Sequence, residues 1–230
     1  MLLICQARHG YFTHREGLGV VYAVRSPFFL RAAGAAVLRV GAPGSAEAAS
    51  ADFLSLGAAL HEAKTGDIVE LLPGVHRTDT LEGDSNAAEA GAVVRSEVII
   101  RGAPGGVRPT LVAGKRVLTI INSCLLQHLC LSPVHTGGQY FPTTLISNVF
   151  SDLSNVDIHV TVVDCVLHSP SPRVPVVLLR TEDSAPAGRT ALHMRGCTMS
   201  SAVAFMPHTT CTVDESCVFT RGAGVEFLAE

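Results

Sequence analysis

The sequence predicts an all-β protein: a right-handed parallel β-helix, or solenoid, with an N-terminal amphipathic helix that caps it. Hydrophobic residues make up 47% of the 230 residues and charged residues only 16%. The uninterrupted apolar runs are nevertheless only about six residues long, as at 174–179, whereas a membrane-spanning helix needs about 20. An apolar chain with such short runs is typical of strands that are buried on both faces.

A cysteine-centred pattern recurs along the second half of the chain. Each copy has alternating apolar residues, a small or acidic break, a cysteine, and an apolar residue two places later; the copies are Val160–Leu167, Leu192–Met199 and Thr212–Phe219, with Leu126–Leu131 as a looser version. The cysteines at 130, 165, 197 and 217 are 35, 32 and 20 residues apart. The shortest interval fits one turn of a solenoid, whose repeats span 20–45 residues. We therefore expect Cys165, Cys197 and Cys217 to be buried, unbonded and stacked in neighbouring coils.

One segment has helical rather than strand periodicity. Phe53, Leu56, Leu60 and Ala63 recur at helical spacing within residues 50–66. Ser50 is a suitable N-cap, and Gly66 is a suitable stop. The helix, 52–64 at its core, should cover one end of the solenoid with its apolar face inward, because such an end exposes strand edges and apolar side chains.

After the helix the pattern changes to short apolar strands separated by turns. Strands are predicted at Ile68–Leu72, Val98–Gly102, Val117–Ile121, Leu126–Leu131, Ile158–Leu167, Val174–Leu179, Leu192–Met199, Cys211–Phe219 and Val225–Leu228. The side chains that should point into one continuous core are Val69, Leu71, Val98, Ile100, Leu118, Ile120, Leu129, Leu131, Val160, Val162, Leu192, Met194 and Val213.

Two regions follow from this pattern. Residues 1–45 form an N-terminal extension or cap with short apolar runs, at 20–24, 28–30 and 36–40, and residues 46–230 form the parallel β-helix domain. The extension carries five Arg against one acid, Glu16, up to Pro43. Such a basic, acid-poor start is also typical of a mitochondrial transit peptide, which stays open as an alternative.

Charge and cysteine usage narrow the classes of function. The net charge of −3 provides no basic field for nucleic acid. The seven cysteines include no Cys-x-x-Cys pair, so we expect neither a disulfide framework nor a structural zinc site. Reduced, buried thiols favour an intracellular protein, cytoplasmic or cytoskeletal, or mitochondrial if the N-terminus is a targeting segment.

Three stretches resemble the opening of the pectin-lyase-like superfamily: Phe53–Ala63, Gly66–His76 and Val98–Gly102. They are similar to its capping helix, its first Gly-Asp-Thr-Ile … Pro-Gly-x-Tyr strand and its second Val-x-Ile-x-Gly strand. The tail from Ser154 resembles the right-handed β-helix repeat of carbohydrate enzymes and of non-enzymatic scaffolds such as certain F-box proteins. The resemblance covers about residues 50–230. The chain departs from it at His76, where the family usually has Tyr, and at Thr78, where its esterases have Glu.

The resemblance implies acidic polysaccharides as the substrates of an enzymatic member. Such reactions use paired carboxylates, or a calcium-binding acidic cluster beside an Arg. The chain has no Asp-Asp or Asp-x-Asp pair, and the esterase and polygalacturonase motifs are missing. If the chain is an enzyme, Asp164 and Asp214 with Arg195 or Arg221 are the candidate catalytic residues.

Weaker patterns are better explained by structure. Arg173 and Arg180 faintly resemble the pectate-lyase Arg-x-Pro-x-x-Arg motif, but the second Arg comes two residues late. Asp157 and His159 lie two apart on one expected strand and could begin an acid/base or metal site, although a solvated outer face is the simpler interpretation. The remaining patterns are the pair His193 and His208, interpreted as surface or hydrogen-bonded histidines, and Gly102–Gly106, interpreted as a turn because it lacks the Lys-Ser/Thr of a phosphate loop.

The sequence thus predicts a non-catalytic scaffold that mediates protein–protein interaction, with a divergent polysaccharide lyase, hydrolase or esterase as the alternative. Partners are expected to be other proteins of a cytoskeletal, ciliary or organellar assembly, not nucleic acid or membrane. No cofactor and no metal site is predicted.

Overall fold

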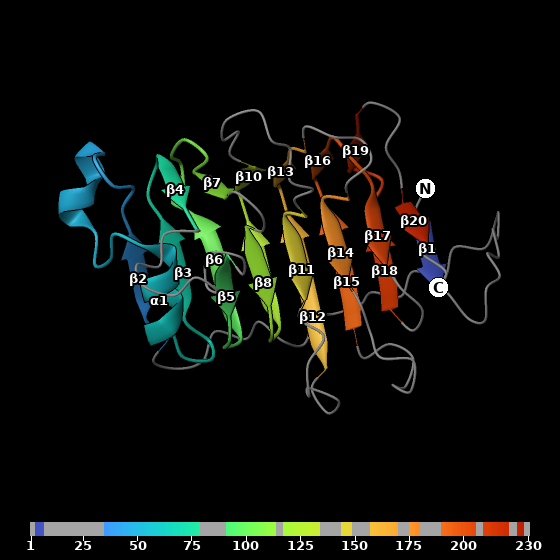
Figure 1. Ribbon diagram of the computed structural model, residues 1–230, viewed down its shortest axis with the longest axis horizontal. Coiled ribbons are helices and arrows are strands. Elements are labelled where there is room, and N and C mark those ends of the chain that lie inside the picture. Colours follow the sequence, from blue (N-terminus) through green and yellow to red (C-terminus); the bar gives the residue numbers. More distant parts are fainter. Residues whose placement is uncertain are drawn as a thin grey trace.

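The computed structural model is a solenoid in which the chain winds through three stacked sheets (Figure 1). It describes residues 3–6, 35–78, 91–113, 117–133, 144–148, 157–169, 175–179, 190–205, 209–220 and 225–227. Each coil contributes one strand to each sheet in turn, and equivalent strands of successive coils pair in parallel. The predicted parallel β-helix architecture is therefore confirmed.

Sheet 1 has eight strands and runs the length of the solenoid. Its strands, in spatial order, are β2 (Val37–Val40), β3 (Ile68–Leu71), β6 (Val98–Gly102), β9 (Cys124–Gln127), β12 (Ile158–Val163), β15 (Thr190–Arg195), β18 (Thr209–Val213) and β1 (Leu3–Gln6). β2 lies within the predicted N-terminal extension, yet it pairs in parallel with β3.

Sheets 2 and 3 have six shorter strands each. Sheet 2 contains β4 (Val75–Arg77), β7 (Thr110–Ala113), β10 (Cys130–Pro133), β13 (Val166–Leu167), β16 (Thr198–Met199) and β19 (Val218–Phe219). Sheet 3 contains β5 (Ala92–Val94), β8 (Leu118–Ile120), β11 (Ile146–Asn148), β14 (Val177–Leu179), β17 (Val203–Phe205) and β20 (Val225–Phe227).

The core is a set of side-chain columns that run along the solenoid axis. In sheet 1 the register aligns Val98, Cys124, Val160, Leu192 and Cys211, all of which are buried. Every side chain predicted from the sequence to point inward is buried and belongs to one continuous cluster. This prediction succeeds because the alternation of apolar residues in a strand fixes which side chains face inward.

The capping helix is shorter than predicted. It spans α1 (Leu56–Glu62) rather than 50–66, and its N-cap is Ser55, whose Oγ accepts a hydrogen bond from the N–H of Ala58, rather than Ser50. Residues 46–50 instead form a 3₁₀ turn, η1 (Ala46–Ser50). The reason is that the intervening residues pair with β2: the backbone N–H groups of Asp52 and Phe53 both donate to the carbonyl of Arg39.

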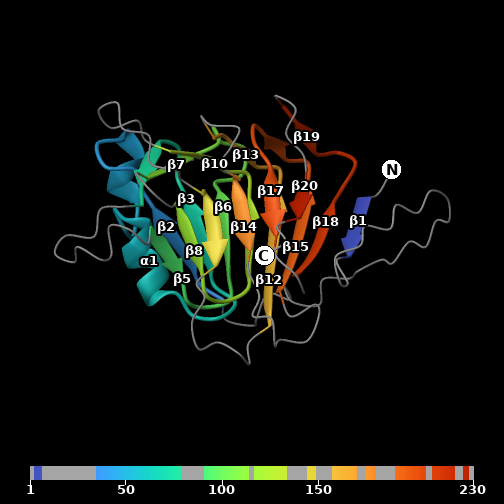
Figure 2. The same cartoon turned by 45° about the vertical axis from the view of Figure 1, so that its right-hand side comes forward.

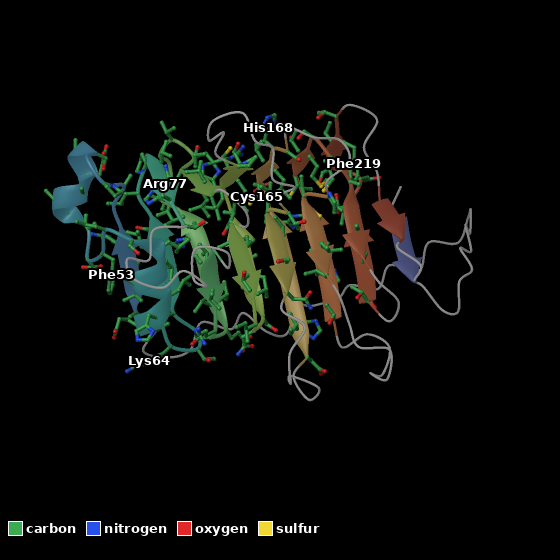
Figure 3. All side chains as sticks on the ribbon, in the orientation of Figure 1. Phe53, Lys64, Arg77, Cys165, His168 and Phe219 are labelled. Atoms are coloured by element: carbon green, nitrogen blue, oxygen red, sulfur yellow. The ribbon has the colours of Figure 1, made fainter. Side chains whose placement is uncertain are left out.

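The position of the helix agrees with its expected role. α1 contacts β2, β3 and β5 at the N-terminal end of the solenoid (Figure 1). Leu56 and Leu60 are buried there, and Phe53 packs against the core from a partly buried position. Figure 3 shows Phe53 at this end and Phe219 near the opposite one.

At the corner between sheets 1 and 2, several strands that were predicted as single strands are interrupted. Leu126–Leu131, Ile158–Leu167, Leu192–Met199 and Cys211–Phe219 are each two strands joined by a sharp corner. In three successive coils the corner residue has a left-handed backbone, with φ of 56° at His128, 51° at Asp164 and 63° at Gly196. That conformation breaks the extended strand, so the small or acidic break in the repeat marks a corner.

The cysteine ladder follows directly after this corner. The N–H of Thr198 donates to the carbonyl of Cys165 and that of Val218 to the carbonyl of Cys197, so Cys165, Cys197 and Cys217 stack in neighbouring coils as predicted. None of the three is in a disulfide, and Cys165 and Cys197 are buried, as predicted. The prediction that Cys217 is buried is wrong: it is half-buried, because it lies in the last coil of the ladder. Cys130 is not part of the ladder: it lies one residue further on, in register with Val166, and Leu129 takes the ladder position in its coil.

β1 is the exception to the parallel arrangement. It pairs antiparallel with β18, with Cys5 opposite Cys211, at the C-terminal end of sheet 1. Both views place this strand beside β18, far from β2 (Figures 1 and 2). Within the part of the chain that the structure describes, no helix is long and apolar enough to cross a membrane.

Candidate functional site

The candidate catalytic residues gather at the corner between sheets 1 and 2, near the C-terminal end of the solenoid. Asp164 follows β12, and its N–H donates to the carbonyl of Arg195, 2.9 Å away, at the end of β15. Asp214 follows β18, and its N–H donates to the carbonyl of Met194. Arg195 thus lies on the coil between the two acids, whose backbones are two strand spacings, or about 10 Å, apart. Arg221, the other candidate cation, lies outside the described residues.

These three side chains lie on the surface of the solenoid. Asp164 and Arg195 are exposed, and Asp214 is partly exposed. Water screens exposed charges, so the attraction between the carboxylates and the guanidinium is weak. The corner therefore brings two carboxylates and a guanidinium together on an open, solvated surface.

Asp214 has a structural task in the turn that follows β18. Its Oδ1 accepts a hydrogen bond of 2.8 Å from the N–H of Ser216. This bond and the Ser216 side chain hold the pKa of the Asp214 carboxyl below its usual value, with a smaller contribution from the positive charge of Arg195. A carboxyl with a lowered pKa is a poor proton donor at neutral pH.

The same turn is tied to the neighbouring coil. The Oγ of Ser216 accepts a hydrogen bond of 2.8 Å from the N–H of Gly196. Gly196 sits directly against the Asp164 carboxylate, so a side chain there would meet Oδ1 of Asp164. The polar groups of the corner thus satisfy backbone groups of adjacent coils, which is the arrangement of a structural corner.

Asp157, His159 and His193 lie at the outer face of sheet 1. Asp157 precedes β12 and is exposed, while His159 lies on β12 and is half-buried. Ser123 links their backbones, because its Oγ accepts a hydrogen bond from the N–H of His159 and donates one to the carbonyl of Asp157. His193 is on β15, and its pKa is lowered by burial and then by the proximity of His159. His208, Arg173 and Arg180 lie outside the described residues.

The remaining patterns concern metal ligands and the glycine-rich segment Gly102–Gly106. Among the described residues, no three or more His, Cys, Asp or Glu side chains are grouped so that they could hold a metal ion. The Gly102–Gly106 segment contains a turn in which the N–H of Gly106 donates to the carbonyl of Ala103, and Gly105 has a φ of +72°. This agrees with its interpretation as a turn.

An ion-pair ladder on sheet 1 was missed by the sequence analysis. Arg39, Glu70 and Arg101 are in register on β2, β3 and β6. Glu70 is buried, and its Oε2 accepts from Nη2 of Arg101 at 2.8 Å, while Oε1 lies 3.7 Å from Nε of Arg39. In the sequence, a charged residue directly precedes the last buried residue of each of these three strands, and this pattern could have revealed the ladder. A buried carboxylate costs free energy unless it is paired with a positive charge. Because Glu70 is paired with an Arg on the strand at either side, this ladder links the first three coils.

The outer face of sheet 2 carries a second feature without a sequence signature. One residue of each strand faces outward in register, and together they form an uncharged row that we call the sheet 2 stripe: Val75, Thr110, Cys130, Val166, Thr198 and Val218. Val75 and Val218, at the two ends, are 58% and 54% exposed, and the four between them are half-buried. Arg77 and His168, both exposed, lie beside the stripe and are labelled along the same side of the solenoid in Figure 3.

No protein-family model matches the chain, and no curated protein matches it in sequence.

Proposed function

We propose that this chain is a non-catalytic β-helix scaffold that binds other proteins, as a subunit of a larger intracellular assembly. The sheet 2 stripe is the observation that carries this proposal. It is continuous over all six strands of the sheet, and every member is a β-branched residue or Cys130. The resemblance of residues 50–230 to the pectin-lyase-like superfamily supports membership in the non-enzymatic branch of that superfamily.

The composition of the stripe favours a protein partner. Charged residues are depleted at the centres of protein–protein interfaces, and contiguous exposed apolar surface marks interaction sites. The stripe has no charged member, whereas a nucleic acid would require a row of Lys or Arg. β-branched side chains also lose little conformational freedom when a partner covers them. The expected partner therefore presents an uncharged, largely apolar surface, with the polar groups around Arg77 and His168 at the rim.

Charge placed in the middle of the stripe should abolish binding. Val166→Glu introduces an unpaired carboxylate at the centre of the interface, where desolvation is most costly. We expect the proteins that co-purify in fixed ratio with the tagged wild-type chain to fall by about tenfold or more, since each 1.4 kcal/mol of binding free energy is a factor of ten. Quantitative mass spectrometry of affinity-purified complexes measures this loss.

Thr161→Glu is the matched control. Thr161 is half-buried and outward-facing in the same coil, but it lies on β12 in sheet 1. This variant should keep the partners and the circular dichroism spectrum of the wild type. Equal recovery of partners by both variants, or equal loss, would contradict the proposal that the sheet 2 stripe binds them.

A divergent carbohydrate-active enzyme is the second candidate function. The meeting of Asp164, Arg195 and Asp214 at one corner favours it, because polysaccharide cleavage in similar folds uses acids beside an Arg. The open surface, the lowered pKa of Asp214 and its engagement with Ser216 argue against it.

We therefore expect no cleavage or de-esterification of polygalacturonate or its methyl ester, with or without calcium. Product formation by the purified chain should equal that of buffer, measured as unsaturated uronide absorbance, reducing ends and released methanol. Activity that is present in the wild type and lost in both Asp164→Asn and Asp214→Asn would replace the scaffold proposal with an enzymatic one.

A further inference from the structure

The cysteine ladder places two thiols in direct contact at the corner between sheets 1 and 2. Cys197 and Cys217 occupy the same position in successive coils, because the pairing of Thr198 with Val218 fixes their register. Their side chains are hydrogen bonded to each other. Adjacent strands are about 4.8 Å apart, which is within the 4.4–6.8 Å separation of Cα atoms that a disulfide spans.

The two thiols have different surroundings. Cys197 is fully buried, and its Sγ lies 3.4 Å from the carbonyl oxygen of Val162 and 3.3 Å from that of Arg195, so its single S–H has these two acceptors as alternatives to the sulfur of Cys217. Cys217 is half-buried and follows the exposed residues Glu215 and Ser216, so a small reagent can reach it. The pair therefore combines an accessible thiol with a sheltered one that is already in contact with it.

The protonation equilibria follow from the same contacts. The hydrogen bond from Cys197 lowers the pKa of Cys217 to about 7, with help from backbone groups of Cys197 and Asp214 and against the effects of partial burial and of the Asp214 carboxylate. The same contact and burial raise the pKa of Cys197. At neutral pH Cys217 is thus partly thiolate, the form that reacts with oxidants, while Cys197 remains a thiol.

We propose that Cys197 and Cys217 form a reversible disulfide, with Cys217 as the peroxide-reactive cysteine and Cys197 as its resolving partner. The thiolate of Cys217 attacks one oxygen of a hydroperoxide, the O–O bond breaks, and Cys217 becomes a sulfenic acid while hydroxide or alkoxide leaves. The sulfur of Cys197 then attacks that of Cys217, the S–O bond breaks, and the hydroxyl departs with the Cys197 proton as water. With hydrogen peroxide, two thiols and one peroxide give one disulfide and two waters, and a small dithiol reverses the reaction by exchange.

Cys130 provides an internal comparison. It is also half-buried and unbonded, but its register neighbours on sheet 2 are Thr110 and Val166. Cys165, the next member of the ladder, is fully buried, and burial raises its thiol pKa to about 12. Neither residue combines an accessible thiolate with an adjacent thiol.

The test is to treat the folded chain with one equivalent of hydrogen peroxide, alkylate the remaining thiols after denaturation, and map the linkage. Trypsin, cyanogen bromide and Asp-N separate the three cysteines of this region onto different fragments by cleaving after Arg195, Met199 and Met206 and before Asp214. We expect a fragment pair that joins Cys197 to Cys217, lost on treatment with dithiothreitol. A Cys217–Cys211 or Cys197–Cys165 linkage, or irreversible oxidation of Cys217 without linkage, would overturn the proposal.

Variants separate the two roles. Cys217→Ser should give no disulfide, Cys197→Ser should leave a Cys217 sulfenic acid that dimedone traps, and Cys130→Ser should behave as the wild type. The pH dependence of Cys217 alkylation should be half-maximal near pH 7 in the wild type and shift upward by at least one pH unit in Cys197→Ala, because alanine, unlike serine, cannot donate the hydrogen bond that is the largest cause of the low pKa. An unshifted profile in a variant with a wild-type melting temperature would also refute the assignment.

Discussion

Leu60→Asp should unfold the N-terminal end of the solenoid and lower the free energy of unfolding of the whole domain by about 4 kcal/mol or more. Leu60 is 3% exposed, on α1, in the cluster that forms the core. Truncation of a buried Leu to Ala alone costs about 2–5 kcal/mol, and a carboxylate placed there adds its desolvation. Since a domain is stable by only about 5–15 kcal/mol, urea unfolding should show a midpoint far below that of the wild type.

Leu54→Asp is the control for this change. Leu54 lies six residues earlier in the same capping segment, but its side chain is 58% exposed. The same substitution there should change the free energy of unfolding by no more than about 0.5 kcal/mol, as is usual for surface positions. Equal midpoints for the two variants would mean that α1 does not cover the core.

Gly102→Ala should strongly destabilise the contact between neighbouring coils. A Cβ on Gly102 would lie 2.6 Å from the carbonyl oxygen of His128 in the next coil and 2.7 Å from Cδ of Pro109. One contact is backbone and the other a rigid ring, so neither can yield without a shift between coils. We expect a loss of about 3 kcal/mol, at the upper end of overpacking costs, seen as a lower midpoint of urea unfolding.

Gly106→Ala is the matched substitution four residues away. There a Cβ would lie 3.5 Å from its two nearest neighbours, the carbonyl oxygen of Ala103 and Cγ of Pro73, which is ordinary packing distance. Its unfolding midpoint should stay near that of the wild type or rise slightly through reduced unfolded-state entropy. A Gly102→Ala midpoint equal to that of Gly106→Ala would show that the corner can widen freely.

The sequence predicted the core well because strand alternation is a local property. Whether Val160 or Thr161 faces inward depends only on the alternating pattern and on the need to bury the apolar set. The helix boundary was less predictable. Ser50 is as good a local N-cap as Ser55, and what separates them is the pairing of Asp52 and Phe53 with Arg39, which depends on contacts across the chain.

The corners and shortest strands escaped prediction for a related reason. Asp164 adopts a left-handed backbone because the coil must turn there, and Asp is one of the few non-glycine residues that tolerate it. β4, β5, β7, β11 and β17 have only three or four residues, too few for periodicity to register. Asp164 and Asp214 lie at equivalent corners because the repeat aligns their coils, and the coil of Arg195 lies between them. The spacing of these residues along the sequence does not show whether their side chains are exposed to solvent.

The antiparallel strand β1 has a consequence for how the chain is made. β1 precedes every other described strand in the sequence, yet its partner β18 belongs to the last coil. During synthesis this segment leaves the ribosome before every other described strand, and it has no partner strand until the coil of β18 has emerged. Coils can meanwhile stack one on another through contacts between neighbours, but the exposed edge of β18 closes only by a contact of very long sequence separation, which is slow to form. We expect the newly synthesised chain to be most prone to aggregation before β1 pairs with β18, when an unpaired strand and an open sheet edge are present together.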